Sequence, residues 1–312
     1  MQRAQGVRIT WDQIPPRVRD AIETQLGGRV VEAWNQQGGF SPGLAARIRT
    51  ESGNRVFLKA AGPDLNPVTP AIHRRESRIA AALPSDAPVP RFLWSLDEGG
   101  AGWIVLAFED VDGRLPSHPW DPAELERAVA AIAAMHRALT PSPIDLPPAA
   151  IRLSRTLNGW ARLRSDEPGL DDWPRRHLET LTALEAEAPE AASGTTMIHI
   201  DLRADNILLT DTDVVIVDWP SAAVGAPWID MIGMAPSVAL EGGPPPEEFF
   251  RLHPASREAH PHRVTAVVAS IAGYFTYNAL QPPPPGLPTL RDFQAAQGAI
   301  TRRWLAERLN LT

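Results

Sequence analysis

Short apolar runs dominate the first third of the chain and predict strands. Glycine, asparagine, proline or aspartate turns separate the runs, and one helical pattern over about residues 68–83 interrupts them before Pro84. Residues 51–54 read Glu-Ser-Gly-Asn and predict a hairpin turn. We therefore expect an antiparallel sheet with one helix, whose strands lie at residues 30–34, 44–50, 56–60, 91–96 and 103–108.

After Gly113 the apolar positions recur with a helical period. Asp121 begins a helix as its N-cap, with Pro122 in the first helical position and Glu124 following. A short β-like island at residues 197–219 lies among the helices, which we expect near residues 121–139, 151–164, 174–188, 228–240, 260–280 and 289–309. The pattern predicts an α+β, two-lobed fold: a small β-rich lobe over residues 1–110 and a larger, mainly helical lobe over residues 111–312.

Composition narrows the class of protein. Hydrophobic residues make up 44% of the 312 positions, which indicates a folded core, and the net charge of −7 argues against nucleic acid as a partner. The absence of cysteine excludes a thiol nucleophile and a Cys-ligated zinc site. The most apolar stretch, residues 264–280, contains polar interruptions and is shorter than a membrane span, so we expect a cytoplasmic protein without a membrane partner.

The basic residues are unusually uniform. They comprise 29 arginines and a single lysine, Lys59. The high Ala, Arg and Pro content is typical of a mutational bias toward GC-rich codons. Such a bias replaces lysine by arginine wherever either residue can do the same work. The surviving lysine is either an accident or the mark of a site that needs a compact ammonium group rather than a planar guanidinium.

The β-like island carries the candidate chemistry. Two apolar runs flank a polar loop that contains His199, Asp201 and Asn206, and the second run ends at Asp218. A carboxylate together with an amide oxygen suits Mg²⁺, and a second carboxylate can accept a hydroxyl proton. The plain alternative is a polar loop without chemistry.

The spacing His199-x-Asp201-x4-Asn206, followed by Asp218, resembles the catalytic loop and metal-binding acid of the protein-kinase-like superfamily. Ile200 and the stretch from Asp218 to Asp230 are similar to its aminoglycoside phosphotransferase branch. The resemblance implies a kinase-like fold that uses ATP (or GTP) and Mg²⁺. It assigns Asp201 as the base, and it assigns Asn206 and Asp218 to the metal.

The resemblance also covers the first lobe, which it implies binds the nucleotide. Lys59 occupies the position of the phosphate-binding lysine, and Glu76 on the following helix is its expected partner, although a solvated role for Glu76 stays open. The glycine-rich turn between the first two strands would cradle phosphates, and the segment near residue 110 would bind adenine through its backbone. The residues assigned to these two parts are Gly39, Ser41, Phe108 and Asp110.

Some positions depart from the protein-kinase pattern. Ile200 replaces an arginine, and no Ala-Pro-Glu segment follows Asp218, so we expect no protein substrate. Arg203 matches a lysine that contacts the transferring phosphate, which implies charge stabilisation; an ion pair with Asp205 or Asp230 is the alternative. We expect Asp230 to brace the catalytic loop rather than touch substrate.

The substrate is expected to be a small molecule with a hydroxyl group, but its class stays open. Residues 228–312 contain 7 acidic and 7 basic side chains, so they lack the acidic excess that a polycationic aminoglycoside would favour. A macrolide, another antibiotic, or a metabolite such as a sugar or amino alcohol remains possible, as does a non-catalytic nucleotide-binding protein. A metal site at His253, His260 and His262 is a weaker hypothesis, because the cluster lacks an acidic ligand.

Overall fold

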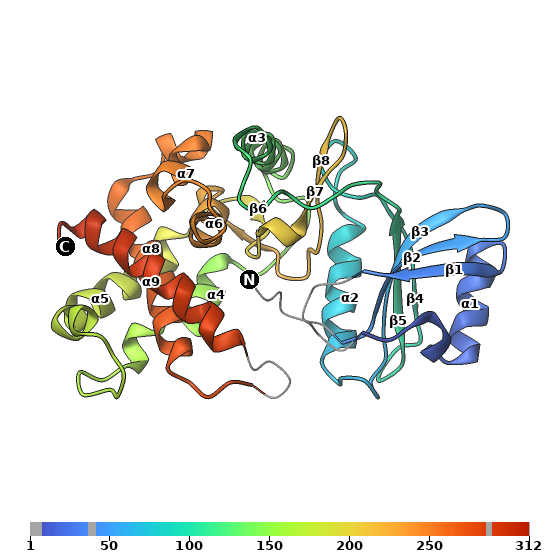
Figure 1. Cartoon of the computed structure of the whole chain (residues 1–312), viewed down its shortest axis with the longest axis horizontal. Coiled ribbons are helices and arrows are strands. Elements are labelled where there is room, and N and C mark those ends of the chain that lie inside the picture. Colours follow the sequence, from blue (N-terminus) through green and yellow to red (C-terminus); the bar gives the residue numbers. More distant parts are fainter. Residues whose placement is uncertain (1–7, 37–41, 285–288, 312) are drawn as a thin grey trace. The chain divides into compact units, whose positions relative to one another are not determined.

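The computed structural model describes residues 8–36, 42–284 and 289–311, and the chain forms two compact units (Figure 1). Unit 1 comprises Met1–Arg114 and Leu208–Pro220, and unit 2 comprises Leu115–Ile207 and Ser221–Thr312. The segment 208–220 therefore packs with the N-terminal sheet, whereas the sequence analysis grouped it with the second lobe.

Unit 1 is built on a five-stranded antiparallel sheet in the order β1-β2-β3-β5-β4. The hairpin between β2 and β3 lies where the sequence predicts it, and the backbone N–H of Thr50 donates to the carbonyl of Asn54 there at 3.0 Å. All five strands were expected. Their bounds are β1 Val30–Asn35, β2 Leu44–Thr50, β3 Arg55–Ala61, β4 Phe92–Asp97 and β5 Ile104–Glu109.

Helices α1 (Pro16–Leu26) and α2 (Thr69–Ala80) lie on opposite faces of this sheet (Figure 1). Side chains alternate between the faces along each strand, so Leu58 joins the core beneath α1, whereas Lys59 lies on the face that α2 covers. The sequence analysis expected one helix here and missed α1, which is preceded by the 3-10 turn η1 (Trp11–Gln13).

Unit 2 is mainly helical, as predicted. Asp121 caps α3, because its carboxylate accepts from the backbone N–H groups of Ala123 at 2.9 Å and Glu124 at 3.1 Å. The helices are α3 Pro122–Ala138, α4 Ala149–Thr156, α5 Asp172–Ala191, α6 Trp228–Leu240, α7 Pro246–Leu252, α8 Pro261–Ala279 and α9 Leu290–Leu309, with 3-10 turns η2 Trp160–Arg162, η3 Ala204–Asn206 and η4 Pro254–Arg257.

The β-like island forms three short strands, and a fourth follows it in the chain. Strand β6 (Thr196–Ile198) pairs antiparallel with β9 (Ala223–Gly225), and β7 (Ile207–Leu209) pairs with β8 (Val214–Ile216). The polar loop runs from β6 through η3 to β7. Its two ends are thus anchored by strands, which is the arrangement that the apolar runs predicted.

The helix expected over residues 151–164 is broken into α4 and η2. Between them, Gly159 lies directly against the backbone of Gly273 in α8, where a Cβ atom would overlap the carbonyl oxygen of Gly273. This close approach fixes the chain direction at Gly159. Farther along the chain, Pro246 begins α7.

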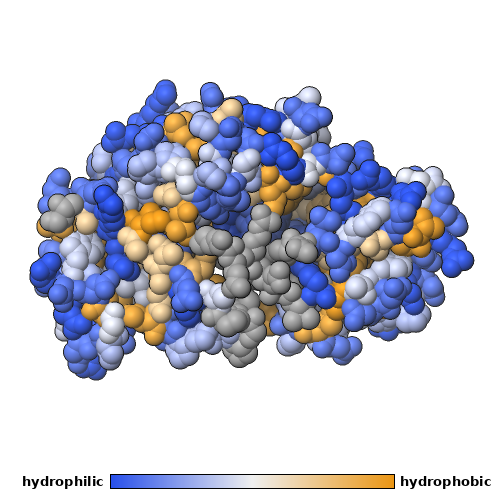
Figure 2. All heavy atoms as spheres, viewed as in Figure 1, coloured by the Kyte–Doolittle hydropathy of each residue, from blue (hydrophilic) through white to orange (hydrophobic). Residues whose placement is uncertain are grey.

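Hydrophilic residues cover most of the face drawn in Figure 2, with apolar residues in smaller groups between them. The large apolar side chains that are exposed are spread over several elements, among them Val31 and Trp34 on β1 and Leu252 on α7. Within the residues described, no helix combines the length and apolar character that crossing a bilayer requires.

Candidate active site

Lys59 lies between two carboxylates in unit 1. Its Nζ donates to Oε1 of Glu76 at 2.6 Å and to Oδ1 of Asp218 at 2.6 Å. Glu76 projects from α2 toward the same sheet face as Lys59 and is only 2% exposed. The Lys59–Glu76 pair that the sequence analysis expected is therefore present, and the solvated alternative for Glu76 is wrong.

The three charges influence one another strongly. Burial opposes the charged form of Lys59, but the carboxylates of Asp218 and Glu76 raise its pKa above the usual range, so the ammonium stays charged. Burial raises the pKa of Glu76, against the effect of Lys59. A lysine held this way presents a compact positive charge at a fixed position.

Asp218 follows β8 in an unusual backbone conformation. Its φ is 71°, in the left-handed region that costs a non-glycine residue roughly 1–2 kcal/mol. The next residue, Trp219, is 2% exposed and its indole N–H donates to the carbonyl of Ile216 at 3.1 Å. Burial of this indole holds the turn, so that Asp218 can face Lys59.

Two further groups surround this cluster, and the sequence analysis assigned neither. Burial lowers the pKa of Arg8, and Asp218 acts on it in the opposite direction. His73 on α2 is 5% exposed, and burial lowers its pKa to about 3, with Lys59 and Arg8 contributing. Arg8 is one of 29 arginines and carries no spacing signal, whereas His73 lies one helical turn before Glu76 on the same face.

The glycine-rich turn is described only in part. The predicted phosphate-binding residues Gly39 and Ser41 lie outside the described residues, so their role stays a prediction. Gly43, at the edge of the turn, has φ of 147°, and a Cβ atom there would overlap the carbonyl oxygen of Ala60. Only glycine fits at this crossing between the start of β2 and the end of β3.

Phe108 and Asp110 lie at the end of β5. Phe108 is 6% exposed and packs edge-on against Phe92, with ring centroids 5.5 Å apart. The carboxylate of Asp110 pairs with Arg47 and with Arg55, at 2.7 Å to the latter. These side chains fix the strand ends, and the proposed contact of this segment with adenine would use its backbone.

The candidate catalytic loop of unit 2 is held by its own polar groups. The Asn206 side-chain N–H donates to the backbone carbonyl of Asp201 at 2.8 Å. The backbone N–H of Asp201 donates to Nδ1 of His199 at 3.3 Å, and the His199 ring is fully buried. The loop thus has a defined shape in which Asp201 and Asn206 are tied to each other.

Asp230, at the start of α6, braces this loop as expected. Its carboxylate accepts from the backbone N–H of His199 at 2.8 Å and from that of Ile200 at 2.7 Å. Ile200 has φ of 72°, so these bonds hold a β-branched residue in the left-handed region. Although burial acts to raise the pKa of Asp230, hydrogen bonding from His136 lowers it below the usual range.

A buried pair of histidines continues from Asp230. The backbone N–H of Ala255 donates to Nδ1 of His253 at 3.1 Å, so the neutral ring carries its proton on Nε2. This Nε2 lies 3.2 Å from Nδ1 of His136, whose Nε2 in turn lies 3.0 Å from Asp230. His253 is therefore part of a hydrogen-bond chain to the loop. Spacing could not reveal it, because His136 and His253 are far apart in sequence.

Arg203 forms a two-point ion pair with Asp205. Its Nε and a terminal nitrogen donate to the two carboxylate oxygens at 3.0 Å and 2.8 Å. One of the two alternatives left open by the sequence, the pair with Asp205, is thus observed. Contact with a transferring phosphate stays a prediction for Arg203.

The predicted metal ligands fit a hard cation by their chemistry. Asn206 uses its side-chain N–H toward Asp201, which leaves its carbonyl oxygen as the ligand atom, and Asp218 offers a carboxylate. Across the described residues, no group of three His, Asp or Glu side chains forms a metal site. This argues against the histidine-rich segment as a metal centre, since His253 bonds His136 and His262 lies 2.6 Å from Glu187.

The sequence over residues 38–264 matches the phosphotransferase enzyme family known as APH. This chain belongs to the APH phosphotransferase family. The family resemblance stated from the catalytic loop is thereby confirmed. No curated protein matches the chain.

Several solved structures have a similar fold. A choline/ethanolamine kinase family protein from Mesorhizobium loti has a TM-score of 0.61 at 16% identity, covering 95% of each chain. Choline kinase LicA from Streptococcus pneumoniae has a TM-score of 0.60 at 13% identity, covering 93% of this chain and 98% of that one. A ternary complex of aminoglycoside phosphotransferase APH(4)-Ia with ADP and hygromycin B has a TM-score of 0.59 at 13% identity, covering 94% of this chain and 98% of that one.

At these identities the likeness shows the fold. The protein-kinase-like α+β fold expected from the sequence is confirmed, with an antiparallel sheet and mainly helical second unit. The proteins compared include a choline kinase and a phosphotransferase in complex with hygromycin B, so the shared fold leaves the substrate open.

Proposed function

We propose that this protein is a kinase that transfers the γ-phosphoryl group of ATP (or GTP) to a hydroxyl group of a small molecule. The observation that carries the proposal is Lys59, the only lysine of the chain, held at 2.6 Å from both Glu76 and Asp218. A fixed ammonium beside a carboxylate suits the α- and β-phosphates of a nucleotide.

Each site residue has a role in this proposal. Asp201 orients the substrate hydroxyl and accepts its proton, while the hydroxyl oxygen bonds to the γ-phosphorus and the bond to the bridging oxygen of ADP breaks. Arg203 stabilises charge on the transferring group. Gly39 and Ser41 cradle phosphates, and the backbone from Phe108 to Asp110 binds adenine. Asn206 and Asp218 hold Mg²⁺, which when bound neutralises negative charge on the phosphates.

The substrate class is the next question. The similar structures include a choline kinase and an aminoglycoside phosphotransferase holding hygromycin B, so amino alcohols and aminoglycosides both belong in a substrate panel. Residues 228–312 carry equal numbers of acidic and basic side chains, which favours a substrate with less positive charge than an aminoglycoside. We expect the protein to act in the cytoplasm and to need neither nucleic acid nor a protein substrate.

The test is phosphate transfer from Mg-ATP to aminoglycosides, macrolides, sugars and amino alcohols, with products identified by mass spectrometry. Asp201→Asn removes the proposed base, and Asp211→Asn, in an exposed turn, is the matched control. We expect a phosphorylated product that disappears with Asp201→Asn and persists with Asp211→Asn.

Nucleotide binding separates this proposal from its alternative, a non-catalytic nucleotide-binding protein of the same fold. Asp201→Asn should keep nucleotide affinity, and Mg²⁺ should strengthen ATP binding. A product formed equally well by Asp201→Asn contradicts the role of Asp201. Absence of ATP binding by the unaltered protein contradicts the whole proposal.

A further inference from the structure

The chain segment at Arg8 and Ile9 is attached to both ends of the glycine-rich turn. The backbone N–H of Ile9 donates to the carbonyl of Gly43 at 3.2 Å, just after the turn. The side-chain N–H of Asn35, at the end of β1 just before the turn, donates to the carbonyl of Ile9 at 2.9 Å. Arg8 also forms a parallel bridge with Gly43. These contacts fix the position of Arg8 at the base of the turn.

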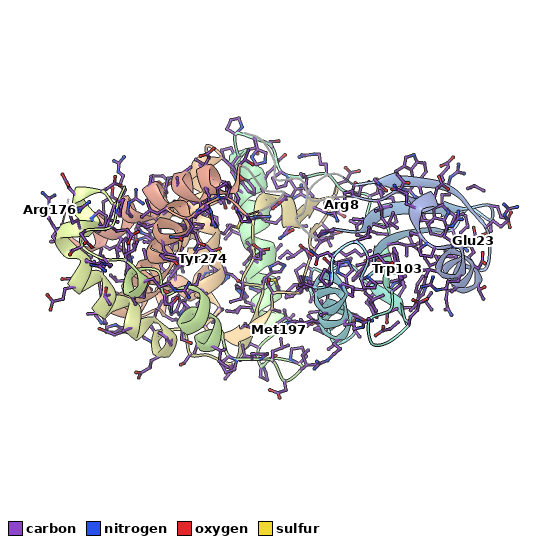
Figure 3. All side chains as sticks on the ribbon, turned by 90° about the horizontal axis from the view of Figure 1, so that it is seen from below. Arg8, Glu23, Trp103, Arg176, Met197 and Tyr274 are labelled. Atoms are coloured by element: carbon purple, nitrogen blue, oxygen red, sulfur yellow. The ribbon has the colours of Figure 1, made fainter. Side chains whose placement is uncertain are left out.

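The side chain of Arg8 belongs to the lysine side of the sheet. Ile9 is 5% exposed and joins the core beneath α1, and successive side chains of an extended segment alternate in direction. Arg8 therefore points to the opposite face, where α2 lies. Figure 3 agrees, because it shows Arg8 toward the end of unit 1 that is away from Glu23 of α1.

The electrostatics agree with this placement. Asp218 acts on the pKa of Arg8, and Lys59, Asp218 and Arg8 all act on the pKa of His73. His73 is 5% exposed, and its Nδ1 has no hydrogen-bond partner among the residues described. A buried ring nitrogen without a partner beside two cations is suited to an acceptor oxygen supplied by a ligand.

The charges of the site favour a second cation. Lys59, Glu76 and Asp218 carry formal charges of one plus and two minus, so before Mg²⁺ is bound these three groups alone repel an anionic nucleotide. Arg8 brings the sum to zero before the ligand enters. Arginine also binds phosphate oxygens through two parallel N–H donors, which the single ammonium of Lys59 does not offer.

We propose that Arg8 is a second phosphate-binding cation of the nucleotide site, with Nδ1 of His73 as a hydrogen-bond donor to the same phosphate chain. This inference rests on the proposed function, since it adds residues to the nucleotide site. The segment at Arg8 and Ile9, which precedes the whole sheet, then contributes directly to nucleotide binding.

The test compares the affinities of AMP, ADP and ATP by titration calorimetry. The test variants are Arg8→Gln and Arg8→Lys. The matched control is Arg29→Gln, which makes the same change of charge at an exposed position in unit 1. We expect Arg8→Gln to lower the affinity for ADP and ATP at least about tenfold and the affinity for AMP by less than about threefold. The reason is that charge-assisted hydrogen bonds to the outer phosphates are lost. Arg8→Lys should retain part of the affinity, and Arg29→Gln should match the unaltered protein.

The outcomes separate this inference from the proposed function. If the unaltered protein binds no nucleotide, the proposed function is wrong. If it binds nucleotide and Arg8→Gln binds ADP equally well, Arg8 is not a phosphate ligand and the proposed function stands. An equal loss for AMP, ADP and ATP also overturns the inference, because Arg8 then acts on the shape of the turn. Thermal unfolding of each variant shows whether the fold is kept.

Discussion

The brace at Asp230 gives a prediction whose magnitude follows from the structure. Three donors converge on its carboxylate: the backbone N–H groups of His199 and Ile200, and Nε2 of His136. Asp230→Asn keeps the shape of the side chain but replaces one acceptor oxygen by an NH₂ group. At least one of the three buried donors then faces another donor.

An unsatisfied buried donor costs about 1–3 kcal/mol, and the remaining bonds lose the strength that a charged acceptor gives, so we expect the free energy of unfolding to fall by about 2–4 kcal/mol. The loop should also lose its fixed shape, because Ile200 occupies a left-handed conformation that the carboxylate holds. We therefore expect kcat to fall at least about tenfold through misplacement of Asp201. The affinity for ADP measured without Mg²⁺ should change little, since Lys59, Glu76 and Asp218 belong to unit 1.

Urea unfolding, calorimetry with ADP and steady-state kinetics measure the three quantities. Asp145→Asn, an exposed residue of unit 2, is the control for the loss of one carboxylate. Unchanged stability and unchanged kcat in Asp230→Asn would refute the reasoning, because the brace would then be dispensable. A loss of ADP affinity as large as the loss of kcat would refute the separation of the loop from nucleotide binding.

Four further changes test other parts of the structure. Lys59→Arg should weaken ADP binding about tenfold in calorimetry, because a guanidinium is too wide for the position between the two carboxylates. Burial raises the pKa of Glu185 to about 7, so between about pH 4.5 and 7 the native state holds a proton that the unfolded chain releases. The free energy of unfolding should therefore fall by up to about 3 kcal/mol as the pH rises through this range. Glu185→Gln should abolish this pH dependence in urea unfolding. Burial lowers the pKa of His253 to about 4, so stability should fall as pH decreases from about 6.5 to 4, and His253→Gln should remove that loss. Gly159→Ala should destabilise by at least about 3 kcal/mol through overlap with the α8 backbone. Gly233→Ala in α6, where the added Cβ would lie 4.0 Å from the carbonyl oxygen of Ile200, should be neutral or stabilising in thermal unfolding.

Local sequence patterns were sufficient to predict much of the fold. The strands of unit 1 and the anchored polar loop were predicted because alternating or continuous apolar runs bounded by turn residues report strands directly. Helix α1 was missed although Pro16 at its first position and Gly27 after its end, with φ of 68°, are standard helix boundaries. The break at Gly159 was missed for a different reason, since a close approach to a distant helix leaves no local signal.

The same division holds for the candidate site. Lys59 and Asp201 could be singled out from the sequence because residue type and spacing carry the chemistry, and the ion pair of Lys59 with Glu76 is observed. The contacts of Arg8, His73 and His253 are tertiary, and a sequence with 29 arginines offers no reason to single out one of them.

The packing of residues 208–220 with the N-terminal sheet has a consequence for how the protein is made. Lys59 and its partner Asp218 are separated by 159 positions, and the chain builds the intervening part of unit 2 before it returns to unit 1. On the ribosome, the sheet emerges long before the acid that completes its lysine site. A nascent or truncated chain ending near residue 114 therefore presents a lysine with only half of its carboxylate partners. The proposed nucleotide site is therefore complete only after synthesis has passed Asp218.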